Sequence, residues 1–226
     1  VNKSFRKFSV DMGGDVRFGL GAVKGLGEGA VEIIIKEREQ NGPYKSLFDF
    51  VHRIPMSAIK RNGMECLVLS GALDCFEEIK REQYFAPNAK GEVFIDVLIR
   101  YATGYQVAME EAQNSLFGGV DEVEIHTPDI PAAEQWSALE KLNKERELVG
   151  IYLSAHPLDE YSIILNQVCN LHLGEMDNLA PFANQDLYFG GIVTGVRQGM
   201  SKRGSAFGIV TLEDYSGAHE LPLFGN

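Results

Sequence analysis

The sequence predicts a mainly α-helical protein with a short β element near its N-terminus and a partial β-barrel at its C-terminus, which is an α+β class overall. Three observations carry this prediction. Apolar residues in the middle of the chain recur at the i, i+3, i+4 spacing of buried helix faces. Both ends contain short runs rich in β-branched and aromatic residues. Glycine-rich turns separate these segments.

Length and composition limit the function. The 226 residues suffice for one large or two small domains, and 45% of them are hydrophobic. No apolar run approaches the roughly 18 residues that span a membrane. Three scattered cysteines argue against a zinc site or a disulfide framework and favour a reducing cytoplasm. Because the start, Val1-Asn2-Lys3, has neither an initiator methionine nor a signal peptide, we expect a soluble piece of a longer cytoplasmic chain.

Charge is unevenly distributed along the chain, whose net charge is −11. Residues 1–65 carry 11 Lys and Arg against 8 Asp and Glu, whereas residues 66–125 carry 4 against 11 and residues 126–185 carry 3 against 9. Any contact with nucleic acid is therefore expected to be short and local to the N-terminal part, because the acidic middle repels phosphates.

The first 16 residues alternate apolar and polar side chains around Phe5, Phe8 and Val10 and break at Met12-Gly13-Gly14-Asp15. This pattern predicts a strand, a turn and a second short strand.

The segment 19–35 is the most informative part of the chain. Glycines alternate with apolar residues up to Gly29, and Val31, Ile34 and Ile35 then continue with helical spacing. The pattern predicts a helix, a hairpin and a helix, with the unpaired amides of Gly25 to Gly29 facing outward, where they would suit a phosphate. A glycine-rich turn that only reverses the chain is the alternative reading.

A second, weaker hairpin follows. Asn41 to Tyr44 stops the first helix, and Ser46 caps a short one that ends near His52. Ser57 or Asn62 is expected to cap a helix through Leu69, after which Ser70 to Asp74 reverses the chain. Lys60 and Arg61, at the entrance of this unit, are candidate phosphate contacts.

Two further helices are expected, over residues 92–109 and within 132–152, separated by an acidic, proline-containing linker that starts at Glu122. The end of the chain then reads as strands over 186–197, 206–212 and a third ending near Phe224. This arrangement is similar to the start of an OB-fold, truncated after about three of its five strands. Single-stranded nucleic acid would contact basic and aromatic residues of such a barrel, here Arg197, Lys202, Arg203 and Phe207.

Three motifs in this order resemble the bacterial DNA polymerase III α subunit. They are Val16 to Gly29 (VRFGLGAVKGLGEG), Leu69 to Asp74 (LSGALD) and Glu147 to Asp159 (ELVGIYLSAHPLD). The resemblance covers nearly the whole chain. It implies a tandem helix-hairpin-helix domain that grips double-stranded DNA through Lys24, Gly25, Gly27 and Gly29. It also implies five parts: the end of the fingers (1–18), the tandem motif (19–112), a clamp-binding peptide (113–119), an acidic linker with a helical segment (120–184) and the truncated OB-fold (185–226).

The clamp-binding peptide is the sequence Gln113-Asn114-Ser115-Leu116-Phe117. In the resembled family, a peptide of the form Gln-x-x-Leu-Phe docks into a hydrophobic pocket of the ring-shaped sliding clamp. The resemblance thus implies Leu116 and Phe117 as anchors, with Gln113 and Ser115 beside them, and other replisome subunits as further partners.

The predicted function is DNA binding and clamp tethering within a replicative polymerase. Nucleotidyl transfer and its magnesium ions are expected in the parent protein, and this segment is expected to be inactive, with no cofactor and no metal, because it shows no paired catalytic carboxylates. A helix-hairpin-helix scaffold of DNA repair and a dinucleotide-binding enzyme are the alternatives. The second lacks the full glycine fingerprint and any βαβ alternation. Whether the parent is a main replicase or an error-prone relative stays open.

Overall fold

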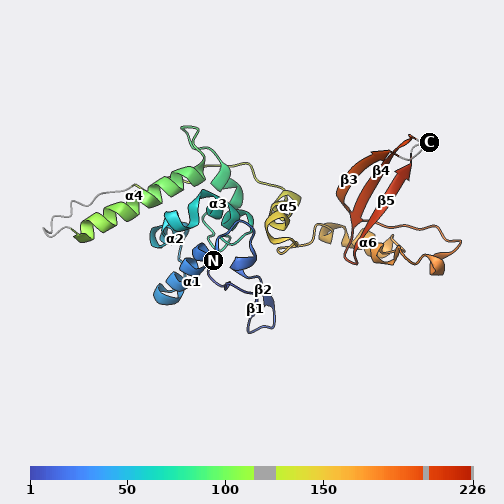
Figure 1. Ribbon diagram of the computed structural model, residues 1–226, viewed down its shortest axis with the longest axis horizontal. Coiled ribbons are helices and arrows are strands. Elements are labelled where there is room, and N and C mark those ends of the chain that lie inside the picture. The colour runs from blue at the N-terminus through green and yellow to red at the C-terminus, as the bar shows by residue number, and fades with distance from the viewer. Residues whose placement is uncertain (115–125, 201–203, 225–226) are drawn as a thin grey trace. The chain divides into compact units, whose positions relative to one another are not determined.

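A computed structural model describes residues 1–114, 126–200 and 204–224 (Figure 1). The chain divides into two compact units, Val1–Leu153 and Ser154–Asn226. Within the described ranges, the first unit contains five α-helices and a small hairpin, and the second contains one short α-helix and a three-stranded sheet. This composition confirms the predicted α+β class with its mainly helical part first.

The N-terminal element is a β-hairpin, as predicted. Strands β1 (Ser9–Val10) and β2 (Val16–Arg17) pair antiparallel. The carboxylate of Asp11 closes the turn by accepting hydrogen bonds from the N–H groups of Gly13 at 2.9 Å and Asp15 at 3.1 Å. A short polar side chain that bonds its own backbone is a common way to stabilise such a turn.

Helix α1 (Glu28–Asn41) follows the first glycine-rich turn, but the segment before that turn is only a three-residue 3-10 helix, η1 (Leu20–Ala22). The reason is a contact between this segment and the N-terminal residues. The N–H groups of Leu20 and Gly21 donate to the carbonyls of Phe5 and Arg6. An added Cβ at Gly21 would lie 2.8 Å from the Arg6 carbonyl oxygen. This close approach to the N-terminal segment leaves no room for a longer helix.

Helices α2 (Leu47–Arg53) and α3 (Met56–Leu69) come next. Ser46 caps α2 as predicted, because its hydroxyl accepts from the N–H of Asp49 at 3.0 Å. The predicted caps of α3 are wrong. Pro55 is the N-cap, so Ser57 lies in the first turn and Asn62 in the interior. Proline already has a φ close to that of a helix, so it can precede a helix without a side-chain cap.

The rest of the first unit consists of the 3-10 helix η2 (Arg81–Phe85), the long helix α4 (Phe94–Asn114) and helix α5 (Ala138–Val149). α5 is shorter than the predicted segment, since it begins after a Ser137 cap and ends at Gly150.

The core of this unit is formed where the apolar faces of the first four helices meet. Each such side chain contributes about 1.5–3 kcal/mol when fully buried. Completely buried members are Val31, Ile34, Leu47, Phe50, Val51, Ile54, Met64, Leu67, Val68, Phe94, Ile95, Leu98 and Ala102.

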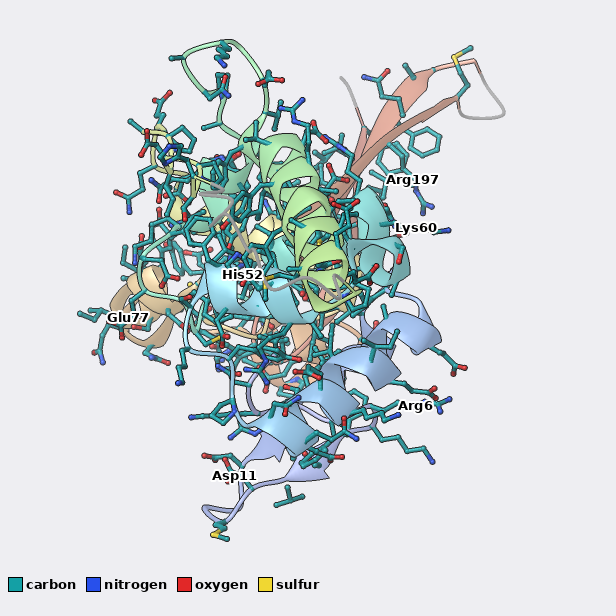
Figure 2. The ribbon with its side chains drawn as sticks, turned by 90° about the vertical axis from the view of Figure 1, so that its left-hand side faces the viewer. Arg6, Asp11, His52, Lys60, Glu77 and Arg197 are labelled. Atoms are coloured by element: carbon teal, nitrogen blue, oxygen red, sulfur yellow. The ribbon has the colours of Figure 1, made fainter. Side chains whose placement is uncertain are left out.

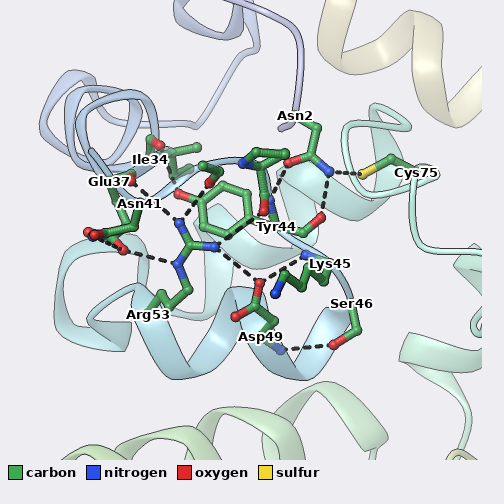
Figure 3. A network of polar contacts seen from close by, with 12 residues as sticks. Asn2, Ile34, Glu37, Asn41, Tyr44, Lys45, Ser46, Asp49, Arg53 and Cys75 are labelled. Atoms are coloured by element: carbon green, nitrogen blue, oxygen red, sulfur yellow. Dashed lines mark hydrogen bonds and ion pairs between the residues drawn. The ribbon is translucent and has the colours of Figure 1, made fainter. Parts of the chain in front are cut away.

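A polar network fixes the connection between α1 and α2 (Figure 3). The Tyr44 hydroxyl donates to the carbonyl of Ile34 at 2.7 Å, and burial raises the pKa of Tyr44 to about 12. Arg53 donates to Glu37 at 3.0 Å and to Asp49 at 3.1 Å, with its guanidinium 4.5 Å from the Tyr44 ring centroid. The side chains of Arg53 and Tyr44 are therefore engaged in holding α1 and α2 together.

The second unit is built on an antiparallel sheet of order β3-β4-β5. Its three strands confirm the predicted run of strands, whereas closure into an OB-type barrel stays a prediction. The elements in chain order are the 3-10 helix η3 (Asp159–Tyr161), α6 (Ser162–Gln167), the 3-10 helices η4 (Leu173–Glu175) and η5 (Ala180–Phe182), β3 (Ile192–Met200), β4 (Ala206–Glu213) and β5 (Ala218–Phe224).

Asp214 holds the turn between β4 and β5. One carboxylate oxygen accepts from the N–H groups of Ser216 and Gly217 and from the Ser216 hydroxyl, and the other accepts from the N–H of Leu173 at 2.8 Å. Burial alone would raise the pKa of Asp214, but these hydrogen bonds outweigh it and lower the pKa. The ionised carboxylate therefore ties the sheet to η4.

Candidate nucleic-acid interface

The first candidate contact is the turn that precedes α1. Gly25 has a φ of +82°, and the residues from Gly27 to Gly29 are exposed. The N–H of Val31 bonds to the carbonyl of Gly27, so the three amides before Val31 are the donors that a helix start leaves without an intrahelical acceptor. Gly27 is the N-cap and has no side chain to cap them. The arrangement presents N–H groups and the positive end of the helix dipole to an anion.

Two contacts from other elements fix this turn. The N–H of Lys24 donates to the carbonyl of Leu148 in α5 at 3.0 Å. The carbonyl of Gly25 accepts from the side-chain amide of Asn62 in α3 at 3.1 Å. The backbone N–H of Lys24 makes this internal contact, while the side chain of Lys24 is exposed at the surface of the turn. The predicted residues Lys24, Gly25, Gly27 and Gly29 thus lie together.

Arg6 belongs to the same region, and sequence reasoning missed it. Its guanidinium pairs with Glu28 and, at 3.1 Å, with Glu32. Glu28 lies in the first turn of α1, where a carboxylate would repel a bound phosphate unless it is neutralised. A signal was available in the sequence, since Glu28 and Glu32 form an i, i+4 pair of like charges that needs a basic partner from elsewhere.

A second exposed turn lies within α3, at the kink around Lys60, where none was predicted. Lys60 has φ 58° and ψ 172°, a conformation that is essentially restricted to glycine, and α3 is kinked there. The Lys60 side chain is exposed and projects outward (Figure 2). Since Asn62 bonds Gly25, the kink lies two residues from the contact that joins this turn to the first.

The neighbouring Arg61 is differently placed from Lys60. Its guanidinium donates to Asp96 of α4 at 2.7 Å and also pairs with Glu65. Both partners are carboxylates, so Arg61 is neutralised within the protein. Of the two predicted basic residues at this helix, Lys60 is the one whose charge is not compensated by an ion pair in the described part of the chain.

The turn from Ser70 to Asp74, predicted as the second hairpin, follows α3 and is occupied by a side chain. Gly71 has a φ of +74°, and an added Cβ there would lie 2.2 Å from a terminal nitrogen of Arg81. The Nε of Arg81 donates to both carboxylate oxygens of Asp74, at 2.9 and 3.0 Å. The guanidinium covers the turn, which therefore presents a packed surface.

Several predicted site residues lie outside the described residues. Of the clamp peptide, Gln113 is in the last turn of α4, and Ser115, Leu116 and Phe117 fall in the gap that follows. Lys202 and Arg203 fall in the gap between β3 and β4. Their predicted roles stay predictions.

Arg197 and Phe207 lie on one face of the sheet, because Arg197 is opposite Ile209 and Phe207 is opposite both Gly199 and Phe224. The ring centroids of Phe207 and Phe224 are 5.7 Å apart. Arg197 pairs with Glu220 on the same face, which compensates its charge.

The described ranges contain neither a membrane-spanning helix nor a cluster of metal ligands. No helix there is long and apolar enough to cross a membrane. No three His, Cys, Asp or Glu side chains within those ranges converge as metal ligands would.

Comparison with known proteins connects this geometry to a family. Residues 1–84 match the family model of the helix-hairpin-helix motif, which covers both exposed turns. Over 99% of its length the chain is 34% identical to DNA polymerase III subunit alpha of Vibrio cholerae, 32% to that of Pseudomonas aeruginosa and 34% to that of Deinococcus radiodurans. The chain is related to DNA polymerase III subunit alpha. It spans about a fifth of the length of these alpha subunits, at 19%, 20% and 17% respectively.

Proposed function

We propose that this chain is the duplex-binding and clamp-tethering segment of a bacterial replicative polymerase of the DNA polymerase III alpha type. The observation that supports it most is the pairing of two exposed turns, at Gly25 and at Lys60, through the single hydrogen bond from Asn62 to the Gly25 carbonyl. Two turns at a fixed distance from each other can contact two phosphates of a DNA backbone at the same time, which one turn cannot do.

Backbone contact is the proposed mode of binding. Free amides before Val31 and the side chains of Lys24 and Lys60 are all suited to phosphate oxygens. Such contacts position a duplex without reading its sequence. The net charge of −11 keeps the contact local, because the acidic remainder of the chain opposes wider wrapping.

Titration of a labelled blunt duplex with the full chain, at several salt concentrations, tests the proposal. Lys60→Ala should weaken binding and reduce the slope of log K against log[salt] by about 0.9, the value for one phosphate contact. Arg61→Ala is the matched control, since Arg61 is already paired with Asp96. An equal loss in both variants, or none in either, would remove the Lys60 contact from the proposal.

The clamp contact is proposed from the sequence alone. Leu116 and Phe117 would each contribute on the order of 1.5–3 kcal/mol on burial, so the peptide by itself should bind weakly and gain avidity from DNA held at the same time. Leu116→Ala combined with Phe117→Ala should abolish capture by a purified ring-shaped clamp, while Asn114→Ala should not. Capture that survives the double substitution would exclude this peptide as the clamp contact.

Nucleotidyl transfer is proposed for the whole parent protein and not for this segment. Primer extension by the 226-residue chain with magnesium should be absent. Measurable extension would overturn the assignment of the chemistry to other parts of the parent.

Single-strand binding by the sheet is a second candidate, supported by the Phe207 and Phe224 rings beside each other on one face. Removal of such a ring should cost roughly 1–3 kcal/mol of binding free energy for each base stacked on it. Phe207→Ala should therefore weaken binding of single-stranded oligothymidine, and unchanged affinity would exclude this face.

A further inference from the structure

We propose that Glu145, a buried carboxylate of α5, positions the first exposed turn, so that α5 sets the geometry of the interface. The consequence for DNA rests on the proposed duplex contact. The positioning itself can be measured without DNA.

Glu145 is an anchor inside the first unit. Only 1% of its surface is exposed, and it lies on a helix whose outward side is charged. One carboxylate oxygen accepts from Arg81 at 3.3 Å and the other from the N–H of Leu153 at 3.0 Å. Burying a carboxylate costs free energy unless it is paired and hydrogen-bonded, so the contact with Arg81 fixes where α5 lies.

Arg81 connects the anchor to α3. Its Nε donates to both oxygens of Asp74, and its guanidinium lies against the backbone of Gly71 in the turn that ends α3. Since α3 also carries Asn62 and Lys60, α5 is fixed relative to the helix that holds the second exposed turn.

Leu148 connects the anchor to the first exposed turn. It lies three residues after Glu145, on the same side of the helix. Its carbonyl belongs to the last turn of α5, where carbonyls have no intrahelical donor, and it accepts from the N–H of Lys24 at 3.0 Å. The contacts that run from Arg81 through Glu145 and Leu148 therefore end at Lys24. The side chain of Lys24 is the one that faces the proposed phosphate.

The start of α5 and the segment just before it, which holds Trp136, have their own contacts. Lys141 pairs with Glu82 at 3.5 Å, and Trp136 stacks on Phe85 with centroids 5.6 Å apart. Loss of the Glu145 charge should therefore free the last turn of α5 and leave its first turns docked. The only tryptophan of the chain reports on that docked part.

The test compares Glu145→Gln with Glu147→Gln in the full chain. Glu147 is exposed on the same helix, so both variants change the net charge by the same amount and attract DNA equally at long range. Amide exchange of Lys24 should become roughly tenfold faster in Glu145→Gln, as expected for a weakened charged hydrogen bond, and should not change in Glu147→Gln. Exchange at Ile34 and Leu67, in the core, should be the same in both. Glu145→Asp, which keeps the charge, should lie between Glu145→Gln and the unmodified chain.

Unchanged Lys24 exchange in Glu145→Gln would overturn the inference. An equal acceleration at Lys24, Ile34 and Leu67 would overturn it as well, because Glu145 would then act only on global stability. In the DNA titration, Glu145→Gln should bind a duplex roughly threefold to tenfold more weakly than Glu147→Gln. If the unmodified chain binds no duplex, the proposed function fails, and the exchange data still decide the role of Glu145.

Discussion

Gly25→Ala is the substitution for which the structure allows the sharpest prediction. A non-glycine residue at a φ of +82° costs about 1–2 kcal/mol. The added Cβ would also lie 2.8 Å from the Cys66 sulfur and 3.1 Å from the Asn62 amide nitrogen. Forcing an extra carbon into such a contact typically costs about 1–3 kcal/mol. We therefore expect Gly25→Ala to reduce the free energy of unfolding of the first unit by about 2–5 kcal/mol, the combination of both costs.

Urea unfolding followed by the fluorescence of Trp136 measures this loss. Gly29→Ala is the matched control. Gly29 lies in the first turn of α1, and a Cβ there meets no atom within 4 Å. Alanine is the better helix former, so Gly29→Ala should raise the free energy of unfolding by up to about 1 kcal/mol. The two substitutions add the same methyl group four residues apart and should differ in sign.

The steric part can be separated by a double-mutant cycle with Cys66→Ala, which removes the sulfur. The double variant should lose less stability than the sum of the two single variants, by about 1 kcal/mol or more, while the cost of the positive φ remains. If Gly25→Ala is as harmless as Gly29→Ala, or if the two sites prove additive, the contact between the turn and α3 does not hold as described.

Three further predictions follow. Lys60→Gly should raise stability by about 1–3 kcal/mol, because it relieves a conformation that is nearly restricted to glycine, and should at the same time weaken duplex binding. His52 stacks on Tyr105 at 3.7 Å, and burial lowers its pKa despite the nearby Asp49, so its contribution to stability is present above pH 6.5 and is lost as the pH falls through the lowered pKa. Melting temperatures on the two sides of pH 6.5 should differ less in His52→Phe. Asp214→Asn should cost the sheet about 1.5–3 kcal/mol by removing charged hydrogen bonds, seen as faster amide exchange in β4 and β5. In the unmodified chain that stability should be fully present above pH 3.8 and should be lost as the pH falls through the lowered pKa of Asp214.

Local patterns explain what the sequence could predict. The Ser46 cap, the strands around Phe207 and Phe224 and the turn at Gly25 each follow from a few adjacent residues, and the structure contains them. The five-part division of the chain and the role of Leu116 depend on the resemblance to a family, and the role of Arg197 depends on the reading of the last strands as the start of an OB-fold; all of them stay predictions.

The kink at Lys60 could not be predicted, because lysine disfavours its φ and only the surrounding structure holds it there. The contact of Arg61 with Asp96 was equally hidden, since Asp96 lies 35 residues further along the chain and the contact is set by packing between helices. The other partner of Arg61, Glu65, is an i, i+4 neighbour on the same helix, so this part of the difference between Lys60 and Arg61 was present in the sequence.

Glu28 shows why the interface depends on residues outside the glycine-rich turn. An acidic residue in the first turn stabilises α1 through the helix dipole, but it lies where a phosphate would bind. Arg6 compensates that charge from the N-terminal segment, whose carbonyls also hold Leu20 and Gly21 at the start of the turn. Because Arg6 is shared between Glu28 and Glu32, the proposed attraction for a phosphate comes from Lys24, Lys60 and the free amides. Amides add affinity without releasing counterions, so binding through this surface should depend only moderately on salt.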